Sequence, residues 1–153
     1  MQLSKNFSLD EMMRSAIAAR HGIDNQPTQE QLERLERLCK LVLQPIRDQL
    51  GVPIFVSSGY RSFKVNQIAK GSRHSDHMTG SAADISAVGY SAPQLARFIT
   101  AMMGDLPIKQ LILEFPPNGW VHVSVAPDDY EPRRDVLTAK LVEGETVYVS
   151  GLA

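Results

Sequence analysis

Three residues have the side chains and the spacing of a metal site. His77 and Asp84 lie seven positions apart with Gly80 between them, and His122 follows in the segment WVHVSV at 120–125. Gly80 lets the chain turn freely between the first two residues. Two imidazoles and one carboxylate leave a fourth position open, as in catalytic zinc sites. Because zinc acidifies a water in that position, the pattern predicts hydrolytic chemistry.

Two further residues have side chains suited to hydrolysis. Glu114 lies at the end of the apolar run LILEF, directly before PPNG at 116–119. An acidic group there costs burial energy unless it has a role or a partner, so Glu114 is the candidate general base. Arg61, in SSGYRS at 57–62, is the candidate for holding a substrate carboxylate or carbonyl. A guanidinium suits this role because its fork donates two hydrogen bonds at once.

Each of these residues also has an ordinary structural interpretation. The pair His77 and Asp84 is compatible with a turn that has a capped end, and a strand histidine such as His122 is often structural. Glu114 is compatible with a surface charge at a strand end, and Arg61 with a surface ion pair. The residues alone therefore leave two alternatives open, a metal hydrolase and an α+β domain without metal.

Length, composition and charge exclude several other classes of protein. The chain has 153 residues, and we expect a single domain over residues 1–153. Its 16 basic and 17 acidic residues lack the basic excess typical of nucleic-acid binding. No apolar run is long enough for membrane insertion, and MQLSKNFSLDEMM has no signal-peptide core. The single cysteine, Cys39, excludes an internal disulfide and a thiolate-rich zinc site.

The first third of the chain, which precedes the candidate site, has the pattern of helices. Capping boxes predict helix starts, and HGIDNQPT at 21–28 predicts a loop. Apolar residues at helical spacing predict a long helix over 28–50 that Pro45 kinks or divides and Gly51 ends. The capping boxes are Ser8 with Glu11, Thr28 with Gln31, and, further along, Ser91 with Gln94.

The rest of the chain has the pattern of short strands that carry the candidate residues. Strands are predicted at 52–57, 82–86, 110–115 and 120–125, followed by a terminal hairpin of 136–142 with 146–150. Residues 58–74 predict a long loop with one helical turn near 65–68, and a helix is predicted from Ser91 to about residue 103. The expected fold class is therefore α+β, with N-terminal helices packed on a mainly antiparallel sheet that carries the candidate zinc site.

These motifs together resemble the zinc D-Ala-D-Ala carboxypeptidases and their relatives among the peptidoglycan peptidases. SDHMTGSAAD at 75–84 matches the family pattern SxHxxGxAxD at all five fixed positions. SSGYRS with Asn66 is similar to the arginine-bearing segment of the family. LILEF and WVHVS are similar to its glutamate strand and last-ligand strand. The N-terminal part, from FSLDEM through GIDNQP to LQPIRDQLG, is similar to small single-domain phage and prophage members.

The resemblance implies a role for each candidate residue. His77, Asp84 and His122 would bind one Zn²⁺, Glu114 would be the general base, and Arg61 would bind substrate.

Two positions depart from the family pattern or lie outside it. In several members the catalytic acid lies three positions before the last histidine, where this chain has Gly119. Other relatives use a wider gap, and the PPNG turn allows Glu114 to return to the metal. His74 has no counterpart in the pattern. The alternatives are that it supports the metal ligands from behind, that it contacts substrate, or that it is an exposed residue without a role in the site.

The implied function is that of a hydrolase, a zinc metallopeptidase acting on peptidoglycan stem peptides. The alternatives for the activity are a D-Ala-D-Ala carboxypeptidase and an L-Ala-D-Glu endopeptidase, in a phage or prophage lysin. A different class is a non-catalytic zinc-containing module of the same fold that binds cell wall or belongs to a phage tail, although a binder has no use for a base. We expect synthesis in the cytoplasm without a signal peptide, and action on peptidoglycan in the periplasm or cell wall.

Overall fold

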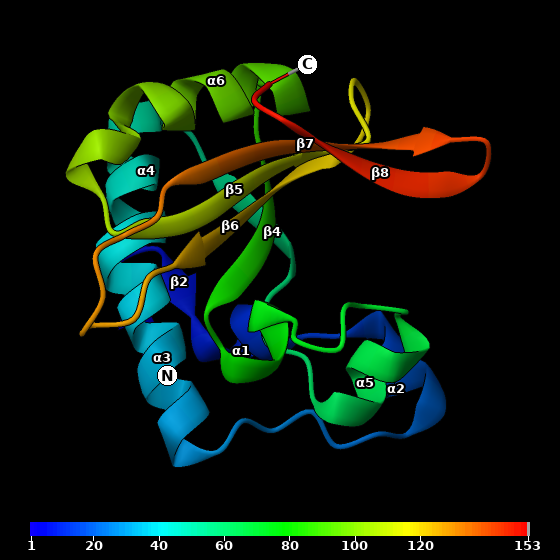
Figure 1. Cartoon of the computed structure of the whole chain (residues 1–153). Coiled ribbons are helices and arrows are strands. Elements are labelled where there is room, and N and C mark those ends of the chain that lie inside the picture. Colours follow the sequence, from blue (N-terminus) through cyan, green and yellow to red (C-terminus); the bar gives the residue numbers. More distant parts are fainter. Residues whose placement is uncertain (153) are drawn as a thin grey trace.

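The computed structural model describes residues 1–152 as an α+β fold, which confirms the predicted fold class (Figure 1). Its six-stranded sheet has the order β3-β4-β6-β5-β7-β8, and all neighbouring strands are antiparallel except the parallel pair β5 and β7. The assignment of residues 1–153 to one domain stays a prediction, and Ala153 lies outside the described residues. The strands are β3 (Ile54–Ser58), β4 (Ala82–Ala87), β5 (Ile108–Glu114), β6 (Trp120–Val125), β7 (Asp135–Val142) and β8 (Glu145–Ser150).

The N-terminal third contains the predicted helices and one small sheet that was not predicted. β1 (Gln2–Ser4) pairs with β2 (Phe7–Ser8), and these strands are too short to show an alternating pattern. Each predicted capping box is present with both of its hydrogen bonds. The helices before the main sheet are α1 (Leu9–Met13), α2 (Ala16–His21), α3 (Gln29–Leu38) and α4 (Gln44–Leu50).

The long helix predicted over 28–50 is divided, as Pro45 indicated. A π-helical segment, η1 (Cys39–Leu43), joins α3 to α4, and Pro45 is the second residue of α4. Proline has no N–H to donate to the preceding turn, and a widened turn is one way to accommodate it. Gly51 ends α4 in the left-handed conformation, with φ of 71°. The division leaves both helices on the same apolar core.

The loop predicted over 58–74 contains a fuller helix than expected, α5 (Phe63–Ile68), which Ser62 caps. The remaining helical elements are η2 (Asp76–Thr79), α6 (Ala92–Met102) and η3 (Met103–Asp105). Within residues 1–152, none of the helices combines the length and the apolar character that crossing a membrane requires.

The two faces of the sheet have different roles because side chains alternate along each strand. One face packs into the core against α3, α4 and α6; its buried residues include Ala83, Ile85, Leu111, Leu113, Val121 and Val123. The other face, called the site face below, carries the candidate residues of β4, β5 and β6. The tightly packed core face thus fixes the strands from which these side chains project.

Candidate metal centre and cleft

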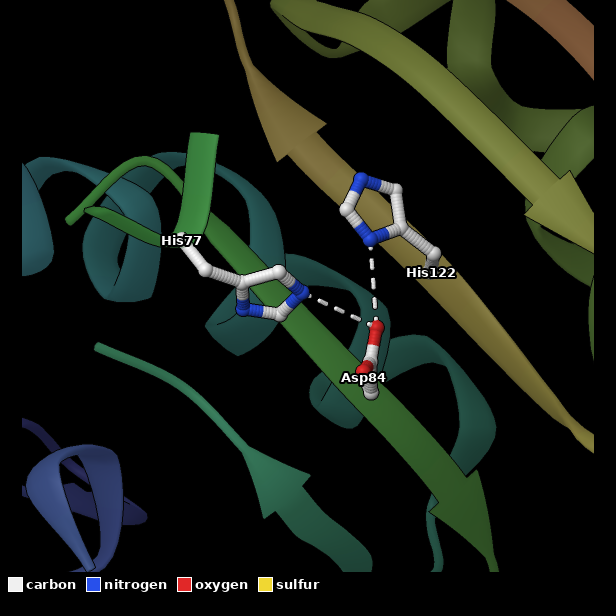
Figure 2. A group of neighbouring side chains, drawn as sticks. All are labelled: His77, Asp84 and His122. Atoms are coloured by element: carbon white, nitrogen blue, oxygen red, sulfur yellow. Dashed lines mark hydrogen bonds and ion pairs between the residues drawn. The ribbon is translucent and has the colours of Figure 1, made fainter. Parts of the chain in front are cut away.

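His77, Asp84 and His122 converge on one point, as the sequence predicted (Figure 2). Asp84 Oδ1 lies 3.2 Å from His77 Nε2 and 3.1 Å from His122 Nδ1. One ligand atom from each residue lies within 4.8 Å of the others. All three side chains are shielded from solvent, with relative exposures of 3%, 4% and 9% for the residues in chain order. This is a buried His-Asp-His group that can hold a metal ion.

Strand register brings Asp84 and His122 together. The two residues are direct partners in the antiparallel pair of β4 and β6, so their side chains leave the same face of the sheet side by side. The small Ala82 and Ala83 begin β4 and are fully buried. His77 comes from outside the sheet, from η2, which ends at Gly80 with φ of 83°. The glycine turn predicted between His77 and Asp84 is therefore confirmed.

A backbone carbonyl fixes the ring of His77. Its Nδ1 lies 2.7 Å from the carbonyl oxygen of Gly59, so Nδ1–H donates to that oxygen and Nε2 faces Asp84. The Arg61 N–H in turn donates to the His77 carbonyl at 3.1 Å. Position 59 has to be glycine, because an added Cβ would lie 2.3 Å from the carbonyl oxygen of Met12. Such outer hydrogen bonds hold a metal-ligating histidine in one orientation.

Asp84 is also tied to a cation on its second oxygen. Arg61 Nη2 lies 3.3 Å from Asp84 Oδ2, while Arg61 Nε donates to Ser58 Oγ at 2.9 Å and Nη1 to Asn66 Oδ1 at 3.4 Å. Burial by itself would raise the pKa of Asp84, but the two histidines outweigh burial and hold that pKa well below its usual range. Asp84 is therefore an ionised carboxylate that can serve as a metal ligand.

Two of the three separations between ligand atoms match those around a small tetrahedral cation. Zn–N and Zn–O bonds of about 2.0–2.1 Å at tetrahedral angles put ligand atoms about 3.3 Å apart. The two separations from Asp84 Oδ1, 3.2 Å and 3.1 Å, are close to that value. Two neutral imidazoles and one carboxylate are also ligands that zinc accepts. The candidate His77, Asp84 and His122 site is thus consistent with zinc.

The metal centre lies in a cleft of about 610 Å³ with walls from both halves of the chain. One wall is the segment from Ala69 to Asp76, before and within the start of η2. The other wall includes Leu137, Thr146 and Tyr148 from the β7–β8 hairpin, which projects beyond the rest of the sheet (Figure 1). Arg61 and Glu114 also line the cleft. The structure thus brings all five candidate residues to one site.

Glu114 lies on the site face at the end of β5, but it is not the direct partner of His122. Trp120 is opposite Glu114, and Ile112 is opposite His122. Burial, followed by the charge of Asp84, raises the pKa of Glu114. The Trp120 indole N–H adjoins this carboxylate, yet it has no partner of hydrogen-bonding geometry within residues 1–152. The contact between the indole and the carboxylate is therefore electrostatic.

Comparison with known proteins agrees with the site. Residues 5–124 match the family model described as Peptidase M15. The chain belongs to the Peptidase M15 family. The resemblance inferred from the motifs is therefore confirmed, and the chain is a member of a family of metallopeptidases. A Peptidase M15 member is expected to act on a peptide. No match was found among curated proteins.

Two groups in the cleft were missed by the sequence analysis. Tyr148 and its neighbours on β8 were assigned to a terminal hairpin, but their approach to the site depends on the parallel pairing of β7 with β5. Lys70, beside the predicted helical turn, carries no motif. His74 is exposed at the edge of the cleft, outside the metal group, and His21 is exposed at the end of α2, as expected of a surface residue.

Proposed function

We propose that this Peptidase M15 member is a zinc-dependent peptidase that hydrolyses peptide bonds in peptidoglycan stem peptides. The observation that carries the proposal is the buried His77, Asp84 and His122 group at the base of a cleft that also contains Glu114. A zinc ion held there would supply Lewis acidity, activating a water molecule and polarising the scissile carbonyl.

Glu114 is proposed as the group that moves the proton. Its carboxylate would accept a proton from the attacking water and deliver it to the nitrogen of the leaving amine. Its place in the same cleft as His77, Asp84 and His122 supports this assignment, because a general base has to lie within reach of the attacking water. The two walls of the cleft would hold the peptide while the proton moves.

Arg61 is proposed to hold the substrate as well as the metal ligand. Its Nε, Nη1 and Nη2 each direct a hydrogen bond at a protein group, and its side chain is 18% exposed. A guanidinium has five N–H groups, so donors remain for a peptide oxygen. The same arginine would then orient Asp84 and bind substrate.

The charges around the cleft favour an acidic peptide. Lys70 is exposed on the wall opposite the β7–β8 hairpin and forms no ion pair in the part of the chain that is described. By contrast, the acidic Asp76 is neutralised by Lys109, whose Nζ lies 2.9 Å from its Oδ2. Stem peptides have free carboxylates that an uncompensated lysine attracts. D-Ala-D-Ala carboxypeptidase and L-Ala-D-Glu endopeptidase activities are both compatible with this cleft.

The biological setting is proposed from the sequence alone. A phage or prophage lysin, made in the cytoplasm and acting on peptidoglycan in the periplasm or cell wall, accords with the resemblance to small phage members.

Digestion of purified peptidoglycan with the zinc-loaded protein tests the proposal. We expect new peptide termini, with fragment masses that identify the bond cut, and no cleavage after treatment with a chelator. Free D-Ala would identify a carboxypeptidase, and cleavage between L-Ala and D-Glu would identify an endopeptidase. Binding to sacculi without any new termini would contradict the proposal and favour a non-catalytic wall-binding or tail module.

A further inference from the structure

Tyr148 lies in the same row of the sheet as Glu114, on the site face. Ala139 of β7 is the partner of Glu114 on one side and of Tyr148 on the other. Residues paired across neighbouring strands project from the same face. Two strand spacings separate the backbones of Glu114 and Tyr148 by about 10 Å. Within this row, the residue between them is Ala139, whose side chain is a single methyl group.

The side chain of Tyr148 lines the cleft and lies close enough to Glu114 for the two groups to interact electrostatically. The ring lines the cleft together with Thr146 two positions earlier on the same face of β8. Burial, followed by the charge of Glu114, raises the pKa of Tyr148. The residue is nevertheless 55% exposed, and its hydroxyl has no hydrogen bond to another group within residues 1–152. A donor without a partner thus stands at the wall of the cleft.

Main-chain hydrogen bonds hold Tyr148 in this place. The Phe115 N–H donates to the carbonyl oxygen of Ala139 at 2.8 Å, immediately after Glu114. β7 pairs with β5 over five consecutive positions, and β8 pairs with β7 along its whole length. The β7–β8 hairpin lies beyond residues 5–124, the part that matches the family model. This wall is therefore a feature of the present chain that the family match does not describe.

We propose that Tyr148 is a substrate-contacting residue, whose hydroxyl donates a hydrogen bond to an oxygen of the peptide bound beside Glu114. The inference rests on the proposed peptidase function and deepens it. Lys70 and Arg61 are cationic donors elsewhere in the cleft, and the hydroxyl adds a neutral donor on the wall formed by the β7–β8 hairpin. The arrangement selects peptides that present oxygen acceptors, carbonyl or carboxylate, toward the β7–β8 hairpin.

Steady-state kinetics of two variants test this inference. Tyr148→Phe keeps the ring and removes the donor, so kcat/KM on a stem pentapeptide should fall about threefold to tenfold, the value of one neutral hydrogen bond. Tyr148→Ala also removes the ring and should lose more than tenfold. The matched control is Val147→Ala, a neighbouring residue of β8 that is 37% exposed and does not line the cleft. Zinc content and melting temperature should be unchanged in all three variants.

The outcomes separate this inference from the proposed function. If the wild-type protein cleaves the peptide and both Tyr148 variants have kcat/KM within twofold of the wild-type value, the inference is overturned. The proposed peptidase function would still stand. Failure of the zinc-loaded wild type to cleave any stem peptide would overturn both. A pentapeptide whose C-terminal carboxylate is amidated identifies the oxygen that accepts the hydrogen bond. If Tyr148→Phe no longer lowers kcat/KM on this peptide, the acceptor is the C-terminal carboxylate. If kcat/KM still falls, the acceptor is a carbonyl.

Discussion

Arg61 and Asp84 form an ion pair behind the metal site, with Nη2 of the arginine 3.3 Å from the outer carboxylate oxygen, Oδ2. The inner oxygen, Oδ1, faces both histidines. The arginine is thus placed to fix the rotation of the carboxylate as well as to meet substrate. Replacing Arg61 should therefore weaken metal binding. Replacing an arginine that contacts only substrate would leave metal binding unchanged.

Arg61→Ala should lower zinc affinity by about 10- to 100-fold, the usual effect of losing a group that orients a metal ligand. Competition with a zinc-binding dye measures this directly, without any activity assay. The control is Arg34→Ala, which breaks the exposed pair with Glu30 on α3 and should leave zinc affinity unchanged. Unaltered affinity in Arg61→Ala would assign the arginine to substrate alone.

His77→Ala should abolish stoichiometric zinc binding, because it removes one of three candidate ligands whose atoms lie within 4.8 Å of one another. Elemental analysis of protein purified without added metal should give about one zinc per wild-type chain and far less in the variant. His74→Ala is the matched control, since this histidine is nearby and exposed at the cleft but lies outside the metal group. Equal zinc in His77→Ala and the wild type would reject the site.

Glu114→Gln should retain zinc and lose about 10²- to 10⁴-fold in kcat, because the amide keeps the size of the side chain but cannot accept the proton. Stem-peptide hydrolysis and zinc content need to be measured on the same preparation. An undiminished rate would exclude Glu114 as the base.

The pKa of Glu114 should lie above the usual glutamate range in the metal-free protein, because burial and the charge of Asp84 disfavour its ionised form. The folded state then binds this proton more tightly than the unfolded chain. Its contribution to stability accordingly declines as pH rises from the usual glutamate pKa through the raised one. NMR titration of the carboxyl carbon measures the shift, and added zinc should lower the pKa because a nearby cation favours the carboxylate. A titration at or below the usual range in metal-free protein would contradict the prediction.

Gly59→Ala should destabilise the fold by about 1–3 kcal/mol, since the new Cβ would meet the Met12 carbonyl oxygen at 2.3 Å. It should also weaken zinc binding, because the displaced Gly59 carbonyl orients His77. Thermal unfolding provides the measurement. In Gly104→Ala, where the added Cβ meets no atom within 4 Å, stability should change by less than about 0.5 kcal/mol.

Several features were predictable because local sequence encodes them. The spacing of His77 and Asp84 around Gly80 and the alternation about His122 indicated the metal group before any fold was known. Capping boxes and Pro45 likewise indicated where helices begin and divide. Element ends differed from prediction by a few residues at most, since hydrogen bonding to neighbours decides where a strand stops.

The remaining features depend on contacts between distant parts of the chain, and only the tertiary structure decided them. Arg61 meets Asp84 because β3 and β4 are neighbours in the sheet, and no local pattern specifies that order. Tyr148 reaches the Glu114 side of the cleft through the parallel pairing of β7 with β5, in a register that places Ala139 between them. A shift of one residue would turn Tyr148 to the other face. The sequence by itself thus indicated the candidate ligands, and the strand order and register decided what surrounds them.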